Sequence, residues 1–173
     1  RLILTAPKVR DKVEQAIADV VKEEYPEAEV LMGTSTAGIA HAAIAASILD
    51  MPMGYVRSGN KDHGRGNRIE GSLLPGQKVV VVEDLISTGG SAIEVVEALR
   101  EAGAEVLGIV SIFTYGMEKG LVRMAEADVK NISLSDFDTI VQVAADTGYI
   151  KQEDVKRLLA FRNDPQDESW IRG

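Results

Sequence analysis

Apolar positions along this chain fall into two patterns, short continuous runs and the three-to-four spacing of an amphipathic helix. A continuous apolar run without polar alternation is typical of a strand buried on both faces. The spacing of Val9, Val13, Ile17 and Val20 instead keeps one helical face apolar, and Pro7 suits the first turn of that helix. The sequence therefore predicts strands at 30–32, 54–57, 79–82, 106–112 and 131–134, a returning strand at 69–72, and helices at 7–25, 39–49, 92–102, 118–127, 135–146 and 152–162.

Strands and helices alternate in this prediction, which favours parallel pairing and right-handed crossovers. The predicted fold class is α/β, a doubly wound, mainly parallel sheet flanked by helices. No internal repeat, low-complexity tract or linker interrupts the 173 residues, so a single domain over residues 1–173 is expected. In such a sheet, ligands bind at the carboxyl ends of the strands.

The strand at 79–82 consists of four valines, and Glu83 and Asp84 follow at its carboxyl end. After two apolar spacers, the small residues of 87–91 open the next helix, where backbone N–H groups can close around an anion. Two acids after a strand often only cap a helix. Acids beside an anion-binding loop indicate instead a ligand that carries both hydroxyls and a phosphate, such as a sugar phosphate. No Lys follows the glycines, so the loop is not a Walker A motif.

A second small-residue loop, 33–38, follows the strand at 30–32 and precedes a helix. Alone it can be an ordinary turn between a strand and a helix. Paired with the first loop, it can offer backbone N–H groups to a second anion. Two anion sites facing one pair of carboxylates indicate a doubly phosphorylated sugar.

The segment 57–68 concentrates positive charge among glycines. Such a segment is commonly an exposed hairpin with solvated charges. It can also fold over a polyphosphate, with Arg57 and Lys61 neutralising the leaving group and His63 assisting proton or charge balance. The other histidine, His41, lies in an apolar helix and is expected to be packed or partly exposed rather than catalytic.

Composition narrows the class of protein. Nineteen basic and 27 acidic residues give a net charge of −8, and no basic run is present, so nucleic acid is not an expected partner. The chain has no cysteine, which fits a cytoplasmic protein, and no apolar stretch of membrane-spanning length or signal-type leader. We expect no metal ligands from the protein itself. Mg²⁺ held mainly by substrate oxygens and water is compatible with the predicted site.

The valine strand, the two acids and the Thr/Gly/Ser loop resemble the signature of the type I phosphoribosyltransferases, which binds 5-phosphoribosyl 1-diphosphate. Residues 55–57, 61–64 and 66–71 resemble the catalytic loop of the orotate phosphoribosyltransferase branch, and 33–40 and 111–115 resemble its bacterial, Bacillus-type form. The resemblance implies the type I phosphoribosyltransferase fold and phosphoribosyl transfer to N1 of orotate in pyrimidine biosynthesis, with Mg²⁺. It also implies an N-terminal hood segment ahead of the point where this sequence begins.

The resemblance further implies roles for single residues. Glu83 and Asp84 would hold the ribose hydroxyls and face the cationic character that develops at the anomeric carbon. Arg57, Lys61 and His63 would engage the diphosphate, with Lys61 and His63 reaching into the partner subunit of a homodimer with shared active sites. Ser87 would also approach orotate. The remaining contacts would come from Leu85, Ile86, Ser87, Thr88, Gly89, Gly90 and Ser91 to the phosphoribosyl group, and from Thr34, Ser35, Thr36, Ala37 and Gly38 to the diphosphate.

Two alternatives stay open at this point. One is a phosphoribosyltransferase for a different base. The other is a non-catalytic regulator that keeps the donor-binding fold and binds nucleic acid. The regulator would require a basic patch or an appended DNA-binding segment, and the sequence contains neither.

Overall fold

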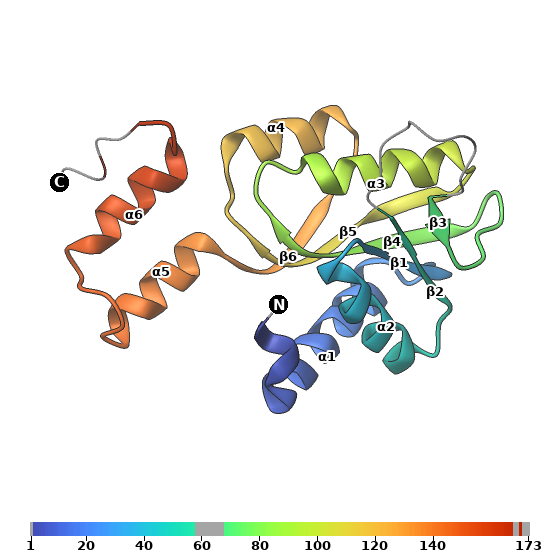
Figure 1. Cartoon of the computed structure of the whole chain (residues 1–173), viewed down its shortest axis with the longest axis horizontal. Coiled ribbons are helices and arrows are strands. Elements are labelled where there is room, and N and C mark those ends of the chain that lie inside the picture. Colours follow the sequence, from blue (N-terminus) through green and yellow to red (C-terminus); the bar gives the residue numbers. More distant parts are fainter. Residues whose placement is uncertain (1, 58–67, 168–169, 171–173) are drawn as a thin grey trace.

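The computed structural model describes residues 2–57, 68–167 and 170, and within them six strands form one sheet (Figure 1). The strand order is β3-β2-β1-β4-β5-β6. All neighbours pair in parallel except β3, which runs antiparallel to β2. The strands are β1 (Val30–Thr34), β2 (Met53–Val56), β3 (Ile69–Glu70), β4 (Lys78–Ile86), β5 (Glu105–Thr114) and β6 (Asn131–Asp136).

Helices cover both faces of this sheet (Figure 1). The elements α1 and α2 lie on one face, α3 and α4 lie on the other, and α5 and α6 extend beyond the β6 edge. The predicted doubly wound α/β fold is confirmed. The helical elements are η1 (Leu2–Thr5), α1 (Pro7–Glu24), α2 (Ala37–Leu49), α3 (Gly90–Glu101), α4 (Glu118–Glu126), α5 (Phe137–Asp146) and α6 (Asp154–Asn163).

The direction of the strand order reverses between β1 and β4. The connection after β1 leads to α2 on one face, whereas the connection after β4 leads to α3 on the other. This reversal is the topological switch point, where open α/β sheets bind their ligands. The two predicted anion loops therefore lie at the carboxyl ends of adjacent strands.

The valines of β4 form the centre of two apolar cores. Val79 and Val81 pack into the cluster that contains α3, while Val80 and Val82 pack into the cluster that contains α1 and α2. All four side chains are fully buried. This alternation explains why the strand carries no polar side chain between Lys78 and Glu83.

Several predicted boundaries around the two loops were wrong, because the strands and helices that flank the loops are longer than predicted. The strand β4 continues through both acids to Ile86 because β5 pairs with it as far as Thr114, and β1 takes in Gly33 and Thr34. The helices α2 and α3 each begin two residues earlier than expected, so both loops are shorter. Val9 was expected on the buried face of α1, but it is exposed near the beginning of the helix.

A chain of aromatic contacts joins the end of β5 to the C-terminal helices. It runs from Phe113 through Tyr115, Phe137 and Phe161 to Trp170, with ring centroids 5.1–6.4 Å apart. Edge-on and tilted aromatic pairs at such distances are favourable. This contact chain fixes α5 and α6 to the sheet edge. In the part of the chain that the structure describes, no helix combines the length and apolar composition needed to cross a membrane.

Candidate active site

The junction between β1 and α2 is very tight. Only Ser35 and Thr36 separate the two elements, and the peptide bond between them is cis. A Cβ on Gly33 would lie 2.8 Å from Ile39 Cα, and a Cβ on Gly38 would lie 2.5 Å from Val82 O. These two glycines are therefore required by the close approach of α2 to β1 and β4. The Ser35 hydroxyl donates a hydrogen bond of 2.6 Å to Val56 O, which ties the junction to β2.

The first acid of the pair belongs to this same junction. Thr34 Oγ1 donates to Glu83 Oε1 at 2.7 Å, and the backbone N–H of Asp84 donates to the same oxygen at 2.9 Å. Glu83 is only 5% exposed. Burial, together with the neighbouring Asp84, raises the pKa of Glu83 to about 7. Near neutral pH, Glu83 therefore carries a proton in a large share of molecules.

The second acid lies differently. Asp84 is partly exposed, as expected from the alternation of side chains along β4, and it lies between the β1–α2 and β4–α3 junctions. Asp84 therefore offers the more accessible carboxylate to a ligand at the switch point. Of the two apolar residues that follow, Leu85 is exposed and Ile86 is buried in the core. Ile86 can contribute only backbone atoms to a ligand.

The β4–α3 junction is formed by Ser87, Thr88 and Gly89. Gly89 has a φ of +77°, a left-handed conformation that favours glycine. No side chain described in the structure caps α3, so the N–H groups of its first turn, which includes Gly90 and Ser91, have no capping acceptor. A helix start of this kind suits a phosphate.

The helix α4 supports this second junction from the side, which sequence reasoning missed. A Cβ on Gly120 would lie 2.6 Å from Ser87 O, so the helix backbone packs directly against the loop. Arg123 Nη1 donates to Thr88 O at 3.4 Å and would lie 3.6 Å from a Cβ on Gly90. The only signal in the sequence was a glycine inside an amphipathic helix with an arginine three residues later.

The predicted cationic residues are only partly described. Arg57 follows β2, is exposed, and its Nε lies 3.3 Å from Glu70 Oε1 of β3. Lys61 and His63 lie outside the described residues. The structure thus brings Glu83 and Asp84 together with both junctions, and it places Arg57 at the end of β2, which neighbours β1.

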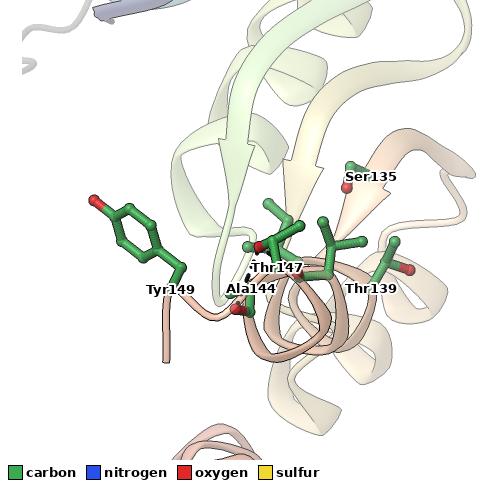
Figure 2. Close-up of a pocket in the computed structure, with 7 residues that line it drawn as sticks. Ser135, Thr139, Ala144, Thr147 and Tyr149 are labelled. Atoms are coloured by element: carbon green, nitrogen blue, oxygen red, sulfur yellow. Dashed lines mark hydrogen bonds between the residues drawn. The ribbon is translucent and has the colours of Figure 1, made fainter. Parts of the chain in front are cut away.

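Two cavities flank the β6 edge and differ in chemistry. One of about 270 Å³ adjoins the β4–α3 junction and has polar lining residues that include Ser87, Thr114 and Asp136. The other, of about 380 Å³, lies along α5, and its described lining residues, which include Thr139 and Ala144, are all uncharged (Figure 2). Among the described residues that line the second cavity, a phosphorylated ligand has no charged partner.

The acids at the switch point were also considered as ligands for Mg²⁺. Among the described residues, no group of three or more His, Cys, Asp or Glu side chains is arranged to hold a metal ion. Carboxylate oxygens are the donors that Mg²⁺ prefers, and this ion commonly keeps several waters and binds substrate phosphates. Asp84, which is partly exposed, fits an ion that takes most of its ligands from substrate and water.

Comparison with known proteins defines the class to which this fold and site belong. Residues 2–147 match the family model of the phosphoribosyl transferase domain. Orotate phosphoribosyltransferase from Bacillus cytotoxicus is 57% identical over 171 residues, which covers 99% of this chain and 81% of that protein. The Bacillus cereus protein of the same name is 56% identical with the same coverage. The chain therefore belongs to the orotate phosphoribosyltransferases, within the phosphoribosyl transferase family.

Solved structures agree with this assignment. The crystal structure of orotate phosphoribosyltransferase from Aeropyrum pernix has a TM-score of 0.75 at 28% identity, covering 86% of this chain and 81% of that one. UMP synthase from Leishmania donovani has a TM-score of 0.80 at 23% identity, covering 94% of this chain and 34% of that one, and supports the fold. The predicted family and fold class are confirmed.

Proposed function

We propose that this chain transfers the 5-phosphoribosyl group from 5-phosphoribosyl 1-diphosphate to N1 of orotate, giving orotidine 5′-phosphate and diphosphate in pyrimidine biosynthesis. The observation that carries the proposal is the hydrogen bond of 2.7 Å between Thr34 and Glu83. It joins the acid pair of β4 to the β1–α2 junction, while the β4–α3 junction begins directly after β4. A ligand with two phosphorylated ends and hydroxyls between them matches that arrangement.

Catalysis in this proposal rests on positioning and electrostatics, without a protein nucleophile. Asp84, with Glu83 behind it, faces the positive charge that develops at the anomeric carbon as the bond to diphosphate breaks. The loop 87–91 holds the 5-phosphate and 34–38 holds the diphosphate. Lys61, His63 and Arg57 neutralise the leaving group, and Ser87 also approaches orotate.

The proposal includes Mg²⁺ and a cytoplasmic location. When bound, Mg²⁺ supplies positive charge to the diphosphate oxygens. Asp84 is the described carboxylate best placed to contact the ion or its water ligands. The chain contains no cysteine, which is compatible with the cytoplasm.

Turnover with separate bases tests the function. The protein is incubated with the donor and Mg²⁺ and with orotate, uracil, adenine or hypoxanthine, and release of diphosphate is measured. Of the four bases, we expect only orotate to give release of diphosphate. Turnover of uracil or a purine with orotate left untouched would contradict the proposal.

We further propose a homodimer in which Lys61 and His63 of one subunit reach the active site of the other. Mixing inactive Lys61→Ala with inactive Asp84→Asn then yields mixed dimers that contain one intact site. With free exchange about half of the dimers are mixed, so roughly a quarter of the wild-type activity returns. No recovery, with mixed dimers demonstrated by mass spectrometry, would reject shared sites without changing the assignment of the reaction.

A further inference from the structure

A single buried polar contact joins the two helices on the β1 side of the sheet. Glu14 of α1 and His41 of α2 are both 0% exposed, and Glu14 Oε1 lies 2.5 Å from His41 Nδ1. The sequence predicted His41 to be packed or partly exposed, but it gave no indication of this carboxylate partner. Glu14 Oε2 and His41 Nε2 have no hydrogen-bond partner among the described residues.

Stability alone does not account for this pair. Removing two polar groups from water is costly, and well-packed apolar residues in their place are often equally stable or more stable. A buried polar pair can instead fix one arrangement of the elements that it joins. In this chain the two helices differ in the size of the side chains that they bury in the apolar core.

The helix α1 is held by large side chains, since Ile17 and Val21 are buried and Tyr25 packs in the same core. The helix α2 buries mainly small side chains. Its buried residues are Ala37, Gly38, His41, Ala42, Ala45 and Ala46, so His41 is the only polar or bulky side chain among them, and partly buried Leu49 packs against the same core at the end of the helix. Small side chains form shallow ridges, which oppose sliding along the helix axis less than interdigitated large ones do.

Any displacement of α2 acts on the adjoining loop, because the helix begins directly after Ser35 and Thr36. At Gly33 and Gly38 the backbone of the junction is in close contact with neighbouring backbone, so a shift of the helix cannot be absorbed there. We propose that Glu14 and His41 are positioning residues that fix α2 along its axis and thereby hold Ser35 and Thr36 in the conformation that binds diphosphate. This inference rests on the proposed function, which assigns the diphosphate to that loop.

Donor binding by calorimetry, without any base present, tests the inference. We expect His41→Leu to raise the Kd for 5-phosphoribosyl 1-diphosphate by about tenfold, because small displacements of binding groups have large effects. His41→Asn keeps a polar nitrogen close to the position of Nδ1, and its Kd should stay within about twofold of wild type. If His41→Leu and His41→Asn bind the donor equally well, the inference is wrong.

The double variant Glu14→Leu/His41→Leu separates positioning from stability. It should recover the denaturation midpoint of the wild type, since no charge is left unpaired, yet retain the raised donor Kd. Recovery of both quantities would overturn the inference. Ala45→Gly, a destabilising change in the same helix, should leave the donor Kd unchanged. The donor Kd is measured without any base and does not depend on which base is the acceptor. A turnover test in which orotate does not react would therefore contradict the proposed function, whereas equal donor Kd values for the His41 variants would contradict this inference.

Discussion

The two strand–helix junctions at the switch point have similar sequences, both rich in glycine and hydroxyl residues, but they are built differently. At the β1–α2 junction, Gly33 and Gly38 are needed because neighbouring backbone leaves no room for a Cβ. At the β4–α3 junction, Gly89 is needed for its left-handed φ, and a Cβ on Gly90 would meet Arg123 Nη1 at an ordinary contact distance of 3.6 Å. The first junction is determined by the packing of α2 against the sheet, whereas the second combines a local backbone conformation with contacts from α4.

This difference matters because, in the proposed function, the ligand is held at both junctions at once. The first junction depends on distant parts of the fold, including the contact of Ser35 with β2 and the tie between Glu14 and His41. The second depends on its own backbone and on the adjacent α4. Substitutions far from the site should therefore affect diphosphate binding more than binding of the 5-phosphate.

The largest effect is expected at the acid between the two junctions. Asp84→Asn removes the charge that, in the proposed mechanism, faces the developing cation, while keeping the size of the side chain. Loss of one such electrostatic contact should lower kcat by on the order of a hundredfold or more. Steady-state kinetics measure the loss, and urea denaturation checks that the fold is kept. Glu83→Gln should lose less, because Glu83 is protonated in many molecules near neutral pH. A wild-type rate for Asp84→Asn would contradict a catalytic role for the acid pair and leave it only a structural role at the end of the strand.

A pH series probes the link between the first junction and β4. The pKa of Glu83 rises from 4.5 to about 7 on folding, so the folded state holds this proton more tightly than the unfolded chain does. The contribution of this proton to the unfolding free energy is complete below pH 4.5 and is lost as the pH rises through 7. A shift of this size corresponds to on the order of 3 kcal/mol.

The measurement compares the unfolding free energy of the wild type and Glu83→Gln at pH 5 and pH 8. The wild type should lose stability over this interval, and the variant, which cannot ionise at this position, should lose less. Parallel losses in both proteins would show that the proton on Glu83 is not linked to folding.

Paired glycine substitutions test the contrast between the junctions directly. Gly38→Ala forces a Cβ against Val82 O and should cost about 1–3 kcal/mol in unfolding free energy and weaken donor binding. Gly90→Ala has its nearest neighbour, Arg123 Nη1, at 3.6 Å, so its stability should be unchanged or slightly higher. Equal losses in the two variants would contradict the assignment of different roles to these glycines.

The sequence predicted the fold well because its strongest signals are local. Four consecutive valines indicate a doubly buried strand, and the alternation of strands and helices indicates parallel pairing. It could not predict that Thr34 belongs to β1 and bonds to Glu83, because that contact spans 49 positions. The tie between Glu14 and His41 and the support from α4 also depend on packing between distant segments.

The smallest expected effect concerns the second junction, where α4 lies beside the loop. No carboxylate in the described residues forms an ion pair with Arg123, whose guanidinium contacts Thr88 O. Its charge adds to the favourable field for a phosphate at the start of α3. Losing that contact should weaken donor binding by roughly fivefold in Arg123→Gln, since one hydrogen bond of this kind contributes about 1 kcal/mol. Arg123→Lys keeps the charge and should lie between the variant and the wild type.

Lys119→Gln is the matched control for this prediction. It removes the same charge from an exposed position on the same helix, and among the described residues Lys119 forms no hydrogen bond or ion pair with the loop. If both variants weaken donor binding equally at low ionic strength and the effect disappears with added salt, Arg123 acts only through the net charge of the protein. An effect confined to Arg123→Gln that persists in salt assigns it to the contact with Thr88. The second junction would then depend on α4 through the Arg123 side chain as well as through the backbone packing at Gly120.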